Sequence, residues 1–257
     1  MRGDGSLRVG YAGGERGARE AARRGAAAIV VDALRASATI AVLVALGARV
    51  RPVATVSEAL ATEADYRAGE RGGEKVPGFD FGNSPVEILG AGVGAGSTVA
   101  LTTTNGTRVI RAASGAPDIF AGCFVNASAV AEALRSRSGE VIVVGCGWRG
   151  HRAAEDERAA GAIIARLVEA GAIPDVRAQK VMRGYRERPL RTLYGVSAAR
   201  RLLSLGYDRD LDVCFAEDSF PVVPVLVDGA FVALRKGAKM SSGALPHNTH
   251  SGRRISS

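Results

Sequence analysis

The sequence predicts a three-layer α/β/α protein built on a mainly parallel, mixed sheet. Short apolar segments suited to buried strands alternate with amphipathic segments suited to helices along most of the chain. Such alternation is typical of parallel sheets with helices on both faces. Near the C-terminus the pattern changes to short strands separated by turns, which indicates antiparallel pairing at one edge of the sheet.

The first part of the chain contains two strand–helix units and one irregular segment. AAAIVVDA (26–33) has the continuous apolar character of a buried strand, and RASATIAVLVALGA (35–48) follows with helical periodicity. RVRPVAT (49–55) is the next expected strand, and VSEALATEADYRAG (56–69) is the next expected helix. GERGGEKVPGFDFGNSP (69–85) is rich in glycine and turn-forming residues, so we expect an irregular segment with a functional role.

Three further units continue the alternation, each with an apolar strand before an amphipathic helix. The strands are expected at 97–104, 118–123 and 140–146, and the helices at 107–116, 128–136 and 156–171. After these units, 197–206 is helix-like. DVCFA (212–216), VVPVLVDG (222–229) and AFVALRKG (230–237) are expected to be strands.

These elements are expected to form one domain over 7–239. With 257 residues, 47% of them hydrophobic, the chain can bury an ordinary core. The segment 240–257 is polar, small and aperiodic, so we expect it to be disordered. No apolar run reaches the length of a membrane span and the first twenty residues lack the apolar centre of a secretory signal, which favours the cytoplasm.

The charge of the chain bears on its partners. The net charge is +8, and only four of the 34 basic residues are lysine. Arginine suits bidentate recognition of phosphate, carboxylate or nucleic acid. Because the basic residues are spread along the chain and aromatic residues make up only 5%, we expect neither nucleic acid nor a membrane as partner. A module that binds an anion or nucleic acid without catalysis is the alternative, and homo-oligomerisation is left open.

Carboxylates follow several of the expected strands and open one helix. Asp32 closes the strand AAAIVVD, and Glu155 and Asp156 begin the helix after the strand at 140–146. Ligands of parallel α/β sheets gather at the carboxyl ends of the strands, and Mg²⁺ prefers oxygen ligands of this kind. The alternative for Asp32 is a helix cap, and the alternative for the helical acids is interaction with the helix dipole.

The stretch LTTTNGTR (101–108) is unusually polar for a strand end. Its hydroxyls and amide lie where a strand passes into a helix, and such a junction offers backbone N–H groups to an anion. The alternative is a local turn with Thr107 as a helix cap. FVNAS (124–128) repeats the pattern after the next strand, which favours a shared polar site.

Cysteine supplies a competing hypothesis for catalysis. The chain has three cysteines without the spacing of a disulfide framework or zinc site. Cys146 and Arg152 have the C-x5-R spacing used by cysteine phosphatases, which wrap a phosphate with backbone amides. No histidine precedes this cysteine, and buried, inert thiols are the alternative.

Five ordered motifs resemble the 2-phosphosulfolactate phosphatase (ComB) family, over about 29–227. They are VVDALRASATI (30–40), GERGGEKVPGFDFGNSPVE (69–87), LTTTNGTR (101–108), GCFVNASAVA (122–131) and the GxxGxxxxED pattern from Gly147 to Asp156. The resemblance implies a magnesium-dependent phosphatase that hydrolyses 2-phospho-3-sulfolactate, a step of coenzyme M biosynthesis, or a related phosphorylated hydroxy acid. The partner it implies is therefore a small anionic phosphorylated substrate.

The resemblance also implies roles for individual residues. The expected catalytic residues are Asp32, Asp80 and Asp156. The expected metal ligands are Asp32, Glu70, Asp80, Glu155 and Asp156, with Mg²⁺ as cofactor. The expected substrate-binding residues are Arg35, Ser37, Arg71, Asn83, Ser84, Thr103, Thr104, Asn105, Thr107 and Asn126.

Overall fold

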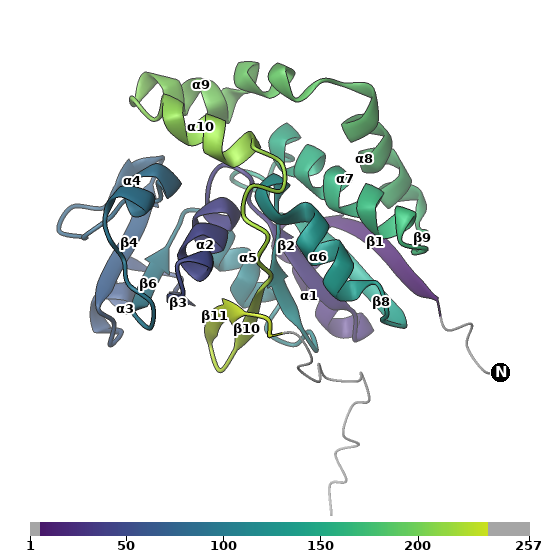
Figure 1. Ribbon diagram of the computed structural model, residues 1–257, viewed down its shortest axis with the longest axis horizontal. Helices are drawn as coiled ribbons and strands as arrows, with labels where there is room; N and C mark the ends of the chain where they lie inside the picture. The colour runs from purple at the N-terminus through teal and green to yellow at the C-terminus, as the bar shows by residue number, and fades with distance from the viewer. Residues whose placement is uncertain (1–5, 236–257) are drawn as a thin grey trace, which may run out of the picture.

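The structure of the protein is a computed structural model that describes residues 6–235 (Figure 1). The segment expected to be disordered, 240–257, lies outside the described residues. The strands are β1 Leu7–Gly13, β2 Ala27–Val31, β3 Arg49–Pro52, β4 Tyr66–Arg71, β5 Glu74–Lys75, β6 Thr98–Thr102, β7 Ile119–Ala121, β8 Gly139–Gly145, β9 Ile173–Pro174, β10 Pro224–Val227 and β11 Ala230–Ala233.

The helices lie between these strands and, in the C-terminal third, follow one another directly. They are α1 Gly14–Arg24, α2 Ala36–Ala45, α3 Val56–Ala61, α4 Pro85–Gly90, α5 Gly106–Ala112, α6 Ala127–Leu134, α7 Ala154–Glu169, α8 Val176–Glu187, α9 Ser197–Ser204 and α10 Asp208–Phe215. Two 3₁₀ turns, η1 Phe124–Asn126 and η2 Leu190–Gly195, complete the set. No helix within 6–235 is both long and apolar enough to cross a membrane.

All the strands belong to one sheet of eleven, in the order β5-β4-β6-β3-β11-β10-β7-β2-β8-β1-β9. The group β4-β6-β3 is parallel within itself, and so is the group β7-β2-β8-β1-β9. The antiparallel hairpin β10–β11 joins the groups through one residue pair on each side, Val225 with Phe120 and Phe231 with Val50. The prediction that antiparallel strands lie at a sheet edge is wrong for this hairpin, because Phe231 is fully buried between the groups.

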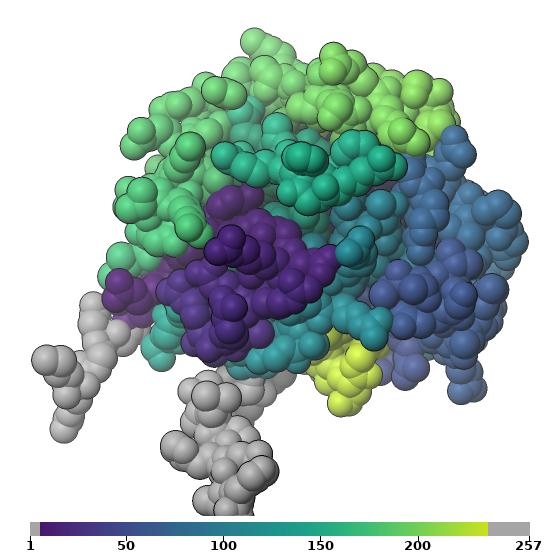
Figure 2. Space-filling model, turned by 180° about the vertical axis from the view of Figure 1, so that it is seen from behind, coloured from purple at the N-terminus to yellow at the C-terminus, as the bar shows by residue number. Residues whose placement is uncertain are grey.

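Two apolar cores on the two faces of the sheet confirm the three-layer α/β/α class. All five residues of β2 are buried, and they alternate between the cores because successive side chains of a strand point to opposite faces. Ile29 packs in the core that contains Ile163 of α7, whereas Val30 packs in the core that contains Ile110 of α5. Figure 2 shows the reverse side, where the purple N-terminal segment lies at the surface, and α1 packs there against β1, β8 and β2.

Helix α2 lies at the centre of the molecule and has no solvent-facing side. Nine of its ten residues are buried, and it packs against β3, β7, β10 and β11 as well as α4 and α5. A helix that is apolar all round is expected in such a position. The loop between β2 and α2, which begins at Asp32, is consequently fixed from both ends.

Two predicted elements are wrong in type. The expected helix at 56–69 ends at Ala61 as α3, and 66–71 is strand β4, because Tyr66 to Gly69 pair with β6. DVCFA (212–216), expected as a strand, belongs to α10, whose buried Leu211, Cys214 and Phe215 have helical spacing. The segment 69–85 is only partly irregular, since β4 and β5 form a short antiparallel pair. Strand β1 and helices α1 and α8 have no counterpart among the predicted elements.

Candidate active site

A cavity of about 770 Å³ opens where β2, β4, β6 and β8 reach their carboxyl ends. Its walls come from the segment after β2, the β4–β5 turn, the loop after β6 and the segment between β8 and α7. Residues 195–198 and 200–202, from the end of η2 and from α9, complete it. Figure 1 shows α9 and α10 crossing this end of the sheet, opposite the β10–β11 hairpin. The cavity therefore lies at the edge where parallel α/β sheets bind ligands.

Asp32 is held at the inner wall of the cavity by the first turn of α2. Its backbone N–H donates to Ser37 Oγ at 2.9 Å, and its Oδ1 accepts from the backbone N–H of Ala36 at 3.3 Å. Asp32 thus accepts from the first N–H of α2, but it is not the N-cap residue, because Arg35 holds that position. Its Oδ2 accepts no hydrogen bond from a described residue and lies beside Gly106, where an added Cβ would stand only 2.7 Å from it.

Glu155 and Asp156 bring two more buried carboxylates close to Asp32 from the first turn of α7, and of these two only Glu155 lines the cavity. Asp156 Oδ1 accepts from the backbone N–H of Ala33 and Oδ2 from that of Gly147, both at 2.8 Å. This carboxylate therefore ties the loop after β2 to the loop after β8. Glu155, which is also buried, lines the cavity.

The cluster has an unfavourable excess of negative charge. Burial raises the pKa of Asp32 to about 7, and the charges of Glu70 and Glu155 add to the shift. The pKa of Asp156 lies well above its ordinary value because of burial and the charges of Asp32 and Glu155. Burial raises the pKa of Glu155 as well. Carboxylates of this kind mark functional sites, because a bound cation would relieve their repulsion.

Glu70 and Thr104 close the side of the cavity formed by β4 and β6. Glu70 Oε1 accepts from the backbone N–H of Thr104 at 2.6 Å, and Oε2 accepts from its hydroxyl at 3.1 Å and from the N–H of Gly73 at 2.7 Å. Thr104 and Asn105 line the cavity. The polar stretch after β6 thus reaches the site in part.

The remaining threonines of that stretch serve the local turn. The hydroxyl of Thr103 accepts from the backbone N–H of Thr107, and the hydroxyl of Thr107 accepts from the N–H of Thr103 and donates to its carbonyl. Both residues are buried. Thr103 and Thr107 thus form the expected local turn, but Thr107 is not the helix cap, because α5 begins at Gly106 and Asn105 holds the N-cap position.

Arg35 lines the cavity, but its guanidinium is occupied by the protein. Nη1 forms a buried ion pair with Asp210 at 2.5 Å, Nη2 donates to the carbonyl of Gly73 at 2.7 Å, and the group stacks on Tyr207 at 4.3 Å. Asp210 also accepts from the hydroxyl of Ser84 at 2.7 Å. Asp210 has no sequence signal, because it falls between an expected helix and an expected strand.

Several expected site residues lie outside the cavity wall. Asp80 is exposed, and its Oδ2 accepts from the backbone N–H of Arg67 at 2.7 Å. Asn126 is fully buried, with its amide bonded to backbone groups of 121, 123 and 222. The other expected residues that do not line the cavity are Ser37, Arg71, Ser84, Thr103, Thr107 and Asp156, of which Asp156 acts through its two backbone contacts.

Among the expected substrate-binding residues, Asn83 has a buried side-chain oxygen that lacks a hydrogen-bond donor within residues 6–235. It is only 3% exposed and lines the cavity, yet its Oδ1 is buried without a hydrogen bond to any described residue. An unpaired buried amide oxygen costs about 1–3 kcal/mol, so a ligand group or ordered water is expected to satisfy it.

The cysteine hypothesis finds no support in the geometry. Cys146 is buried and does not belong to the cavity wall. Its pKa is well above the ordinary value because of burial and the nearby charges of Asp32 and Asp156. A nucleophilic cysteine needs the opposite shift. Arg152, its proposed partner, forms an ion pair with Glu157.

The carboxylates at the cavity wall suit Mg²⁺, which binds few protein groups, better than they suit a metal ion whose ligands all come from the protein. Within residues 6–235, no three His, Cys, Asp or Glu side chains are grouped closely enough to enclose a metal ion. Mg²⁺ typically takes one or two carboxylates and keeps several waters or substrate oxygens. Asp32 and Glu155, buried at the cavity wall with raised pKa values, suit that pattern.

Comparisons with known proteins give a consistent result. A family model described as 2-phosphosulpholactate phosphatase matches residues 15–229. A protein of Thermotoga petrophila named probable 2-phosphosulfolactate phosphatase is 40% identical over 212 residues, 80% of this chain and 91% of that protein. Proteins with the same name from Thermotoga maritima and Thermosynechococcus vestitus are 39% and 37% identical, over 80% and 77% of this chain and 91% and 87% of their own.

Proposed function

The chain belongs to the 2-phosphosulfolactate phosphatase family, and we propose that it hydrolyses the phosphate monoester of 2-phospho-3-sulfolactate or of a related phosphorylated hydroxy acid in a Mg²⁺-dependent reaction. The products are the hydroxy acid and inorganic phosphate, and coenzyme M biosynthesis is one setting for this chemistry. The observation that carries the proposal is that the buried carboxylates of Asp32 and Glu155 line the cavity, with the buried carboxylate of Asp156 interacting with both from behind the wall.

Asp32 is the group best placed to move a proton. Its Oδ1 is oriented by Ala36, whereas Oδ2 accepts no hydrogen bond from a described residue. A pKa of about 7, raised chiefly by burial, lets this carboxylate exchange a proton near neutral pH. We assign to Oδ2 the proton lost by the water that attacks phosphorus. The P–O bond to the hydroxy acid breaks, and its oxygen takes up a proton from solvent.

Asp32 and Glu155, with Asp156 beside them, would hold Mg²⁺. When bound, the ion would offset the charge of the phosphoryl oxygens and act as a Lewis acid. Asp156 fixes the loops beside the other two carboxylates, because it accepts hydrogen bonds from the backbone amides of Ala33 and Gly147. Asn83, with its unpaired Oδ1, is the group to accept a hydrogen bond from the substrate or its hydration water.

The test is phosphate release from 2-phospho-3-sulfolactate, 2-phospholactate and p-nitrophenyl phosphate. We expect release that stops with EDTA and returns with Mg²⁺, and Cys146→Ser should stay within about threefold of wild type because a buried thiol with a raised pKa does not act as nucleophile. Release that persists in EDTA but disappears in Cys146→Ser would instead support the cysteine mechanism. Acid quenching during turnover would reveal a phosphorylated protein if Asp32 attacks phosphorus directly.

A further inference from the structure

Helix α9 brings positive charge to the cavity wall on which sequence reasoning placed no site residue. Arg200 and Arg201 line the cavity together with the carboxylates of Asp32, Glu70 and Glu155. The wall thus combines an acidic part, supplied by β2, β4 and α7, with a basic part supplied by α9. A ligand that carries two separated acid groups would meet different environments at its two ends.

The other arginines of the wall are already paired. Arg35 is neutralised by the buried carboxylate of Asp210, and Arg152 by Glu157. Arg201 forms no ion pair with a described residue, and its Nε donates to the carbonyl of Gly72. Arg200 has neither an ion pair nor a side-chain hydrogen bond to any residue in 6–235. The charge on α9 is therefore available to a ligand.

Buried contacts hold α9 in place and so position this charge. Arg158 of α7, itself buried, donates to the carbonyl of Arg188 at 2.8 Å and to the hydroxyl of Thr192 at 3.2 Å, which fastens the segment before α9. The Arg35–Asp210 pair fastens α10 on its other side. A fixed helix reduces the conformational cost of presenting an arginine to a ligand.

We propose that Arg200, assisted by Arg201, binds the second acid group of the substrate, the sulfonate or carboxylate that does not react. This inference rests on the proposed function, and it defines the substrate class as phosphate monoesters of small acids. The carboxylate cluster repels a second anion, whereas a guanidinium offers paired N–H donors that match sulfonate and carboxylate oxygens. The α9 arginines would then select the substrate without taking part in cleavage.

The decisive variant is Arg200→Gln, with Arg209→Gln as its matched control. Arg209 is an exposed arginine of neighbouring α10 that does not line the cavity. We expect Arg200→Gln to lower kcat/KM for 2-phospho-3-sulfolactate about 10- to 100-fold, mainly through KM. Hydrolysis of p-nitrophenyl phosphate, which lacks a second acid group, should change less than about twofold. Arg209→Gln should match wild type on both substrates.

Equal losses on the two substrates, or no loss on phosphosulfolactate, would overturn the proposal. Calorimetric titration with sulfolactate provides a readout that does not depend on hydrolysis. Binding should weaken by a similar factor in Arg200→Gln and persist in Arg209→Gln. If wild type hydrolyses no ester, the proposed function fails, yet sulfolactate binding still decides the role of Arg200. Wild-type protein that does not bind sulfolactate would rule that role out.

Discussion

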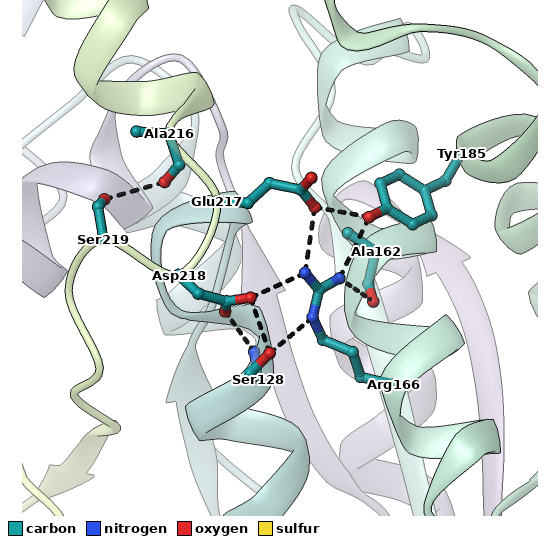
Figure 3. A network of polar contacts seen from close by, with 8 residues as sticks. All are labelled: Ser128, Ala162, Arg166, Tyr185, Ala216, Glu217, Asp218 and Ser219. Atoms are coloured by element: carbon teal, nitrogen blue, oxygen red, sulfur yellow. Dashed lines mark hydrogen bonds and ion pairs between the residues drawn. The ribbon is translucent and has the colours of Figure 1, made fainter.

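Two groups of charged residues in this protein have opposite electrostatic character. Asp32 and Glu155 at the cavity wall and Asp156 behind it are buried carboxylates that repel one another, and their pKa values are raised. On the outer side of α7, Arg166 lies at the centre of a network in which every carboxylate has a donor (Figure 3). The guanidinium of Arg166 contacts Ser128 Oγ, the carbonyl of Ala162, Tyr185 Oη, Glu217 and Asp218.

The pKa of Asp218 shows the effect of that pairing. Burial alone would raise it, but the pKa is lowered because Asp218 accepts hydrogen bonds from the N–H and hydroxyl of Ser128 and from Arg166. The network joins α6, α7 and α8 to the segment after α10, as Figure 3 shows. Acidic residues thus have two different roles in this fold. Paired carboxylates stabilise the folded state, whereas carboxylates buried close to one another destabilise it and are typical of functional sites.

The largest effect on activity should come from removing the charge of Asp32, the central member of the crowded group formed by Asp32, Glu155 and Asp156. Asp32→Asn keeps the shape of the side chain but cannot accept a proton, so we expect kcat to fall about 10³-fold. The thermal midpoint at pH 8 should rise, because a repulsive buried charge is lost. Phosphate release and thermal unfolding measure both effects. A variant that is both inactive and less stable would show that Asp32 has a structural role.

A smaller effect on activity is expected from crowding Asp32 while leaving its charge. In Gly106→Ala the new Cβ would stand 2.7 Å from Asp32 Oδ2 and 2.9 Å from the Cβ of Ala36, so one of them must move. We expect kcat/KM to fall about 10- to 100-fold and unfolding free energy to fall by about 1–3 kcal/mol.

Gly184→Ala in α8 is the matched control for that variant. An added Cβ there meets no atom within 4 Å. Alanine is the better helix former, so the control should gain about 0.5–1 kcal/mol at unchanged activity. Full activity in Gly106→Ala would mean that the position of Asp32 Oδ2 is not critical.

Removing the cation of the paired group, in which Arg166 contacts Glu217 and Asp218, should change stability but not activity. Arg166→Gln leaves Asp218 and Glu217 without their shared cation, and we expect a loss of about 1–2 kcal/mol in urea unfolding with kcat within about twofold of wild type. Arg135→Gln is the control, because the Arg135–Glu132 pair is exposed and 3.5 Å apart; its loss should stay below about 0.5 kcal/mol. A large drop in kcat for Arg166→Gln would couple the network to the active site.

The pH dependence of stability should have opposite signs in the two groups. The pKa of Asp32 is raised from 3.8 to about 7, so the folded state keeps a proton that the unfolded state has lost, and stability falls as pH rises through this window. The pKa of Asp218 is lowered, so its contribution is present above 3.8 and is lost as pH falls below that value.

Unfolding free energy measured from pH 3 to 8 tests this contrast. Asp32→Asn should flatten the decline between about pH 4 and 7, and Asp218→Asn should flatten the decline on the acid side. Mg²⁺ should raise the thermal midpoint of wild type at pH 8 but have little effect on Asp32→Asn, since the ion would offset the crowded charge. Identical pH profiles for the two variants would contradict the division into crowded and paired groups.

The local sequence pattern was sufficient to predict the positions of the site residues that follow buried strands. The apolar run ending at Val31 defines β2, so the place of Asp32 at a strand end follows from the sequence, as do those of Thr104 and Asn105 after β6. Glu155 and Asp156 follow from the helix that begins after β8. Parallel strands present their ends at the same edge of a sheet, which is why these residues lie near one another.

Contacts between distant segments could not be inferred in the same way. Asp80 was expected to share the role of Asp32, yet it is exposed and accepts a hydrogen bond from the backbone of Arg67. Arg35 was expected to bind the substrate, but its guanidinium is paired with Asp210, which lies 175 residues later in the sequence.

The sequence by itself therefore determined the layered class, the central strands and the acidic strand ends, because each depends on the periodicity of neighbouring residues. Only the tertiary structure decided which charges are paired, which stay free and which side of the cavity receives Arg200. The physical reason is that pairing and burial depend on groups brought together by the packing of α7 to α10 over the sheet, and no local pattern records that packing.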